Sequence, residues 1–226
     1  MPITIQQIGP SCLLISWENK ITSKTSREVY HFNRAILKAF KSEIVDSVPA
    51  YCSLTLFINH SADLTNFINQ LFNIYNTIDF STEIISRHWN VPVCYHPSLG
   101  FDLGLLSSIL NLSIDEIILL HCTPLYTVDF IGFLPGFPYL SGLNKILQAP
   151  RLSSPRTLVN DGSVAIGGKQ TGIYPVSSPA GWNIIGRTRF KLFNVNDNNP
   201  CPISPMDTLQ FKPITLSEFN TALTND

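Results

Sequence analysis

The segment Gly132-Phe-Leu-Pro-Gly-Phe-Pro-Tyr-Leu140 opens the part of the chain that decides its fold. Nine of the twelve glycines lie between Gly132 and Gly186, and six of the sixteen prolines are interleaved with them. Glycine lets the backbone turn tightly or approach a ligand closely, and proline fixes the conformation of loops. This quarter of the chain therefore predicts many short turns, and it is where we expect the functional site.

From Leu125 onward the sequence is typical of an almost all-β structure, because short apolar segments are separated by Gly, Pro and Asn turns, as in a barrel or a sandwich. The expected strands span residues 126–131, 163–166, 170–174, 182–185, 189–193 and 208–211. Two short helices are expected before them, at 102–110 and behind the capping box of Ser113 and Glu116. A closing helix is expected behind a further capping box, Thr215 with Glu218.

The first third of the chain indicates alternating strands and helices. Strands are expected at 12–17, 44–48 and 54–58, an amphipathic helix at 26–40, and a second helix capped by Ser61. With 91–95 as the last strand, this order is the split βαβ pattern of ferredoxin-like folds. Polar residues around 81–87 mark the boundary. We therefore expect an α+β protein with an N-terminal ferredoxin-like α/β domain at 1–84 and a β domain at 85–226.

Bulk composition narrows the class of protein. The chain has 226 residues, 44% of them hydrophobic, which is enough for a sizeable core, but it contains no run of eighteen apolar residues and no signal-like start. The five cysteines are an odd number at irregular spacings, which favours reduced thiols over disulfides or a zinc site. We expect a cytoplasmic protein with no membrane segment and no bound metal.

Charge is unevenly distributed. Residues 145–191 carry seven basic side chains and one acid, Asp161, which is a local charge of +6. Two interpretations are open: a solvated face of the strands, or a pocket for a carboxylate or phosphate. The rest of the chain has eight bases against fifteen acids, so nucleic acid is not expected as a partner.

The motifs of self-contained enzymes are absent from the sequence: there is no Walker A loop, nucleophile elbow, His-Glu-x-x-His helix or Rossmann turn. All five histidines lie outside the glycine-rich quarter, which excludes a nucleophile–histidine pair built within it. The quarter offers aromatic rings, hydrogen-bonding groups and cations, a set suited to recognition. The candidates are Phe133, Phe137, Tyr139, Tyr174 and Trp182, then Ser163, Gln170 and Thr171, and the cations Arg151, Arg156 and Lys169. Core packing is the alternative role for the aromatics.

Five ordered motifs in this quarter resemble the KipI family, which includes the B subunit of 5-oxoprolinase and allophanate hydrolase subunit 1. The motifs are residues 132–140, Ala149-Pro-Arg151, Gly162-Ser-Val-Ala-Ile-Gly167, Gln170-Thr-Gly-Ile-Tyr-Pro175 and Ser178-Pro-Ala-Gly-Trp182. The resemblance extends over nearly the whole chain. It adds three motif positions to the expected substrate-binding set, Gly136, Pro138 and Pro179.

The resemblance implies a fold and an activity. The expected fold is an N-terminal α/β domain followed by a cyclophilin-like β-barrel of the carboxyltransferase C/D type, related to one half of the carboxyltransferase module of urea carboxylase. The expected activity is that of the B subunit, acting with a paralogous C subunit and an A subunit, in an ATP- and Mg²⁺-dependent 5-oxoprolinase that opens 5-oxoproline to glutamate. No catalytic residue is identified beyond the candidates Arg151, Arg156 and Lys169.

The resemblance leaves two other activities open. One is inhibition of a sensor histidine kinase through the barrel domain, and the other is allophanate hydrolysis in urea breakdown. The chain also departs from the family pattern at Asn160-Asp161 and at Ala180. We expect Ala180 to resist a positive φ that glycine would accept, and Asp161 to bring negative charge into the site, so that ligand preference changes.

Overall fold

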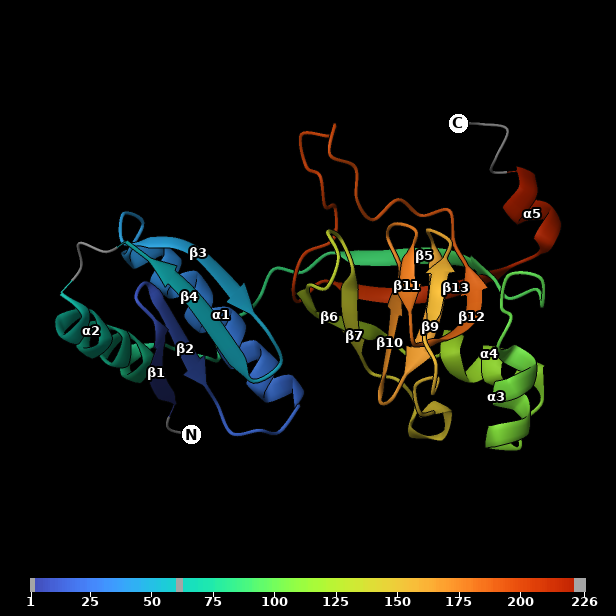
Figure 1. Cartoon of the computed structure of the whole chain (residues 1–226), viewed down its shortest axis with the longest axis horizontal. Coiled ribbons are helices and arrows are strands. Elements are labelled where there is room, and N and C mark those ends of the chain that lie inside the picture. The colour runs from blue at the N-terminus through green and yellow to red at the C-terminus, as the bar shows by residue number, and fades with distance from the viewer. Residues whose placement is uncertain (1–2, 60–62, 222–226) are drawn as a thin grey trace. The chain divides into compact units, whose positions relative to one another are not determined.

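The computed structural model describes residues 3–59 and 63–221, and the chain divides into two compact units, residues 1–85 and 86–226 (Figure 1). This division, between residues 85 and 86, lies one position from the boundary expected between residues 84 and 85. Each unit has its own hydrophobic core. The units are described separately below.

Unit 1 is a four-stranded antiparallel sheet with two helices. Its elements are β1 (Thr4–Gly9), β2 (Cys12–Ser16), α1 (Ser23–Ala39), β3 (Ile44–Pro49), β4 (Ser53–Ile58) and α2 (Leu64–Thr77). Alternating residues put Leu13 opposite Leu56 and Ile15 opposite Leu54, so one face of the sheet is apolar. The helices bury Phe32 and Leu71 in the same core, which is why they cover that face.

The strand order β1-β2-β4-β3 corrects one expectation. Strands β2 and β3 flank β4 and are joined by α1, so the expected split βαβ is confirmed. The strand expected at 91–95 does not join this sheet, and β1 takes the edge beside β2 instead. The sequence of β1, Thr-Ile-Gln-Gln-Ile-Gly, is half polar because an edge strand has one solvated side. This polar composition is why the strand was not predicted from the sequence. The Ser61 cap lies outside the described residues, and Asp63 is the N-cap of α2.

Unit 2 is a closed seven-stranded barrel in the order β10-β7-β6-β13-β5-β12-β9 (Figure 1). The barrel strands are β5 (His88–Cys94), β6 (Tyr126–Ile131), β7 (Pro138–Ser141), β9 (Ser163–Gly167), β10 (Gln170–Ile173), β12 (Asn183–Arg187) and β13 (Thr208–Ile214). A two-stranded sheet pairs β8 (Arg156–Val159) with β11 (Ser178–Ala180). The fold class is thus α+β, as predicted, and the barrel rather than a sandwich is formed.

The barrel closes through a parallel pair, β5 with β13, in which His88 lies opposite Thr208 and Cys94 opposite Ile214. The other pairs between its strands are antiparallel. Asp207, 3% exposed, ties the two strands at their start, because its carboxylate accepts from the backbone N–H of Arg87 (2.9 Å) and from Trp89 Nε1 (2.9 Å). Residues 91–94 therefore belong to the barrel sheet of unit 2 and not to the sheet of unit 1.

The expected helices of unit 2 are confirmed. They are α3 (Leu103–Leu110), α4 (Ile114–Cys122), which begins at the Ser113–Glu116 capping box, and α5 (Leu216–Thr221), which follows the box of Thr215 and Glu218. The strand expected at 189–193 is wrong: that segment is irregular, and its alternating Phe190 and Leu192 pack on the barrel core without joining the sheet. Strands β7, β8 and β11 were missed because each is only three or four residues long and contains or directly follows a proline, which is a turn signal.

No single helix of the described residues is long and apolar enough to cross a membrane. Only α3 and α4 taken together pass that test of length and composition, and they are bent by 95° at the break between them.

Candidate functional site

Strand alternation separates the side chains of the barrel wall into two sets. Val164 and Ile166 of β9 enter the interior core, whereas Ala165 belongs to a second cluster with Trp182 and Tyr174. Gly167 makes room for this second cluster, because a Cβ there would lie 2.5 Å from the Trp182 ring. The two clusters are therefore packed on opposite sides of the strands.

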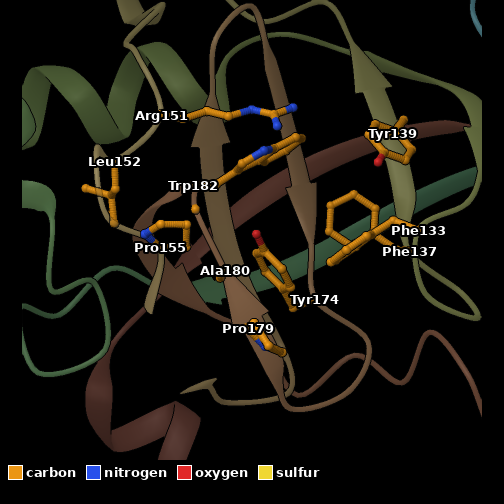
Figure 2. A pocket seen from close by; sticks show the side chains of 11 residues that line it. Phe133, Phe137, Tyr139, Arg151, Leu152, Pro155, Tyr174, Pro179, Ala180 and Trp182 are labelled. Carbon is orange, nitrogen blue, oxygen red and sulfur yellow. The ribbon is translucent and has the colours of Figure 1, made fainter. Parts of the chain in front are cut away.

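A cavity of about 310 Å³ lies at this second cluster (Figure 2). Three sequence-distant segments form its wall: the β6–β7 turn and the start of β7, the segment 151–155, and the stretch from Tyr174 through β11 to the start of β12. The lining residues are Phe133, Phe137, Tyr139, Arg151, Leu152, Pro155, Tyr174, Pro179, Ala180, Gly181 and Trp182. The volume is at the lower end of small-molecule pockets.

Phe137 is the centre of the aromatic wall. Its ring makes edge contacts with Tyr139, Tyr174 and Trp182 at centroid distances of 5.0, 5.2 and 5.6 Å. Phe137 and Trp182 are buried, so the packing alternative holds for Phe137 in particular. Phe133 differs: the residue is 64% exposed, and its φ of +67° is one that non-glycine residues rarely adopt. Such strain is characteristic of functional sites.

Arg151 supplies the positive charge of the cavity. Its guanidinium carbon lies 5.8 Å from the centre of the Trp182 ring, a cation–π contact, and Figure 2 shows the two side chains side by side. Among the described residues, no carboxylate lies within ion-pair distance of it. The guanidinium is thus available to an anionic ligand.

Two tyrosines bring hydroxyl groups to the same cavity. Burial raises the pKa of Tyr174 to about 12, although the neighbouring backbone N–H of Trp182 and the charge of Arg151 oppose that shift. Burial also raises the pKa of Tyr139, against the effect of Arg151. Both hydroxyls are therefore neutral at physiological pH and can donate hydrogen bonds to a ligand.

Seven predicted site residues line the cavity: Phe133, Phe137, Tyr139, Arg151, Tyr174, Pro179 and Trp182. Arg156 does not, because its guanidinium pairs with the buried carboxylate of Asp102 at 2.6 Å. Lys169 is exposed in the β9–β10 turn and is not among the lining residues. Gly136 and Pro138 are buried beside the cavity and shape the β6–β7 turn: a Cβ at Gly136 would lie 2.7 Å from Phe193.

Three further predicted residues, Ser163, Gln170 and Thr171, also lie outside the cavity lining. The Ser163 carbonyl accepts from the Tyr174 N–H at 2.9 Å, so it places a lining residue. Gln170 lies opposite Gly167, and its Nε2 is buried without a hydrogen-bond partner among the described residues. Four lining residues lie outside the predicted substrate-binding set: Leu152 and Pro155, which are next to the candidates Arg151 and Arg156, and Ala180 and Gly181, which lie within the motif 178–182.

The side chain of Thr171 points into the barrel, where it contacts His121, a histidine from outside the glycine-rich quarter. Its hydroxyl donates to the Ala165 carbonyl (2.9 Å), so its oxygen accepts from His121 Nε2 (2.9 Å). Nδ1 of His121 then accepts from the Tyr95 hydroxyl at 2.8 Å. Burial lowers the pKa of His121 to about 3, so the ring stays neutral and the chain of hydrogen bonds is a structural one.

The two departures from the family pattern have different outcomes. Ala180 lines the cavity, but it lies in β11 and its φ is not positive, so the expected backbone strain is wrong. Asp161 lies outside the cavity lining, because its carboxylate pairs with Arg187 Nη2 at 2.6 Å. The expectation that it adds negative charge to the site is wrong as well.

The lining residues are suited to binding and not to proton transfer. They include no carboxylate, imidazole, thiol or amine, and both tyrosines are neutral. Within residues 3–59 and 63–221, no group of three or more His, Cys, Asp or Glu side chains could hold a metal ion. The residues that line this cavity therefore do not offer the carboxylate ligands that Mg²⁺-ATP sites use.

Comparison with known proteins identifies the family of this chain and agrees with its fold. Residues 3–203 match the family model described as carboxyltransferase domain, subdomain C and D. The 5-oxoprolinase B subunit of Haemophilus influenzae is 36% identical over 209 residues, which are 92% of this chain and 97% of that one. The solved structure of TTHA0988 matches with a TM-score of 0.79 at 30% identity, over 90% of this chain and 40% of that chain.

The urea carboxylase of Kluyveromyces lactis matches with a TM-score of 0.82 over 99% of this chain and 23% of that chain. At 17% identity this likeness concerns the fold alone, and it confirms that the fold is the one expected from the carboxyltransferase module of urea carboxylase. The sequence matches to the 5-oxoprolinase B subunits show kinship as well as fold, because they span nearly all of this chain and nearly all of each relative. The chain therefore belongs to the family of the carboxyltransferase domain, subdomain C and D, and is a relative of the 5-oxoprolinase B subunits.

Proposed function

We propose that this chain is the B subunit of an ATP-dependent 5-oxoprolinase and that it supplies the binding site for 5-oxo-L-proline, which the complex hydrolyses to L-glutamate. The observation that carries the proposal is the cavity in which the Arg151 guanidinium, which forms no ion pair within the described part of the chain, lies over the ring of Trp182. 5-Oxoproline is a small five-membered lactam with one carboxylate, and both of its parts have a counterpart there.

Each part of the ligand is assigned to named groups. The carboxylate pairs with Arg151, whose planar guanidinium matches two oxygens at once. The methylene face of the ring packs on Trp182, whose own position is held by Phe137 behind it. The neutral hydroxyls of Tyr139 and Tyr174 are the donors for the lactam oxygen. The chain thus binds and orients the lactam for chemistry that it does not perform alone.

The reacting groups come from other subunits in this proposal. An unstrained amide is a poor electrophile, and transfer of a phosphoryl group from ATP to its oxygen, with release of ADP, makes the ring carbon more electrophilic. Water then adds to that carbon, the ring C–N bond breaks with the nitrogen leaving as the amine, and a second water hydrolyses the resulting acyl phosphate to glutamate and phosphate. The cavity residues cannot hold Mg²⁺-ATP or activate water, because none of them is a carboxylate or a base. We therefore assign ATP binding to the A subunit or to the paralogous C subunit, the partners implied by the family.

The test is purification of the tagged chain from its own cells, followed by an assay for glutamate from 5-oxoproline with and without ATP. We expect ATP-dependent glutamate from the eluate, co-purification of two further subunits, and no activity from the isolated chain. An inactive eluate with intact partners would refute the proposal. A captured sensor histidine kinase would then indicate the inhibitor activity, and urea-pathway proteins would indicate allophanate hydrolysis.

A further inference from the structure

Arg151 lies in a segment without regular secondary structure, yet backbone hydrogen bonds fix the chain on both sides of it. The Ala149 carbonyl accepts from the Gly168 N–H at 2.8 Å. The Leu152 N–H donates to the Gly181 carbonyl, also at 2.8 Å. These bonds join the segment to the β9–β10 turn and to the residue before Trp182. The carbonyl of residue 150 is held differently.

A side chain completes this attachment. Asn183 Nδ2 donates to the Pro150 carbonyl at 2.9 Å and to the Ile166 carbonyl of β9 at 3.2 Å. Asn183 begins β12, directly after the aromatic ring on which Arg151 lies, and it is 2% exposed. One amide thus links the Arg151 segment to the barrel wall.

We propose that Asn183 is a positioning residue that holds Arg151 over Trp182 and so fixes the carboxylate-binding end of the cavity. This inference rests on the proposed function, because it takes Arg151 as the group that pairs with the carboxylate. Asn183 contacts no ligand itself, since it is not among the residues that line the cavity.

The chemistry of the amide explains why this position requires asparagine. Only the NH₂ end of the side chain can bond to two carbonyl oxygens, so the orientation of the amide is determined. An apolar side chain of similar size would leave the Ile166 and Pro150 carbonyls without this donor. The segment would then lose the hydrogen bond at Pro150, which lies between the two backbone bonds at residues 149 and 152. The ligand would have to order the Arg151 guanidinium when it binds, and this loss of conformational entropy would lower the affinity.

The first test measures steady-state kinetics of the reconstituted complex carrying Asn183→Leu. We expect KM for 5-oxoproline to rise about tenfold, with kcat changed less than about twofold, because binding loses the preorganised charge and the chemistry elsewhere does not. KM for 5-oxoprolinamide, which has no carboxylate, should stay as in the wild type. In an Arg151→Ala background, Asn183→Leu should have no further effect on KM.

Ile185→Val is the matched control, because Ile185 is a fully buried residue of the same strand whose side chain belongs to the interior core. It should lower the melting temperature without changing KM. A tenfold rise in KM for Ile185→Val, or equal rises for the acid and the amide in Asn183→Leu, would overturn the positioning role. Where Asn183→Leu fails to fold, Asn183→Ser, whose shorter side chain cannot reach the Pro150 carbonyl, takes its place.

The second test does not depend on the substrate. Amide hydrogen exchange at Leu152, whose N–H is bonded to Gly181, should accelerate at least tenfold in the Asn183 variant and stay unchanged in Ile185→Val. Unchanged exchange at Leu152 would overturn the inference whatever the ligand is. Faster exchange in a complex that does not turn over 5-oxoproline would support the attachment and refute the proposed function instead.

Discussion

Arg151 is unusual among the basic residues of its stretch because it lines the cavity and has no acidic partner among residues 3–59 and 63–221, whereas Arg156 and Arg187 are paired with Asp102 and Asp161. We predict that Arg151→Ala raises KM for 5-oxoproline in the reconstituted complex by about 10- to 100-fold, the cost of losing a charge-assisted hydrogen bond. Enzyme kinetics at saturating ATP provide the measurement.

Lys169→Ala is the matched control for charge, because it removes one exposed positive charge from the same stretch outside the cavity. It should change KM less than twofold. Equal effects of the two substitutions would mean that the overall field of the +6 stretch, and not the guanidinium at the cavity, attracts the substrate.

Gly167 is required by the ring that packs on it. A Cβ at this position would lie 2.5 Å from Trp182, so Gly167→Ala should displace the ring, destabilise the protein by about 1–3 kcal/mol and weaken ligand binding. Tryptophan fluorescence and urea denaturation measure the two effects. Gly104→Ala in α3 is the control: nothing lies within 4 Å of its Cβ, and it should stabilise the protein by about 0.5–1 kcal/mol. A Gly167→Ala protein as stable as wild type would contradict this account.

The aromatic half of the site could be predicted because its residues sit in glycine- and proline-rich turns whose composition reveals them. Residues on the strands could not be assigned in the same way. Gln170 and Thr171 are neighbours, yet one lies opposite Gly167 and the other bonds to His121 inside the barrel. The direction of a side chain alternates along a strand, and the register that decides it comes from pairing with distant strands.

At the scale of elements, α3 is attached to β12 by Asp102. Its buried carboxylate accepts from Arg156 and from the Ile184 N–H, each at 2.6 Å. Asp102→Ala leaves both donors unpaired and should destabilise the protein by about 3 kcal/mol in urea denaturation. Asp161→Ala removes an ion pair whose carboxylate is 61% exposed, and it should cost at most about 1 kcal/mol. A similar loss of stability in the two variants would contradict the greater contribution assigned here to the buried Asp102 carboxylate.

The junction of β5 and β13 should make stability depend on acid. Burial acts to raise the pKa of Asp207, but hydrogen bonds from Arg87, Trp89 and Ser204 outweigh it and hold that pKa below its ordinary value. A lowered folded-state pKa stabilises the protein above about pH 4 and loses that contribution as pH falls further. We predict that Asp207→Asn lowers the melting temperature at pH 7 and weakens its decline between about pH 4 and pH 2.5. An unchanged decline in the variant would contradict this assignment.

Helices were predicted better than strands. The apolar spacing of α1 and the capping box of α4 are local signals, and both elements are where these signals place them. The strand at 91–95 was assigned to the wrong unit because its partners, β12 and β13, lie about 90 or more residues further along the chain. The hydrophobic pattern of a segment predicts that a strand is buried, but it does not predict which strands pair with it.

At the scale of the whole molecule, two cores imply two folding units. Residues 86–226 contain the closed barrel, its interior core and the separate aromatic cluster at which the cavity lies. We predict that this fragment alone unfolds cooperatively in calorimetry and binds 5-oxoproline, detected by Trp182 fluorescence, with an affinity within about threefold of that of the full chain. A fragment that stays unfolded would show that residues 1–85 are needed for the barrel.

The parallel closure of the barrel also has a consequence in time. Because β5 pairs with β13 between residues 120 positions apart, it stays without that neighbour until the last strand of the barrel has been synthesised. At about 5–20 residues per second, that delay is roughly 6–24 s on the ribosome. During it the unpaired edge of β5 is a target for chaperones and for aggregation. Synthesis halted before Thr208 would leave every other barrel strand present and the barrel open.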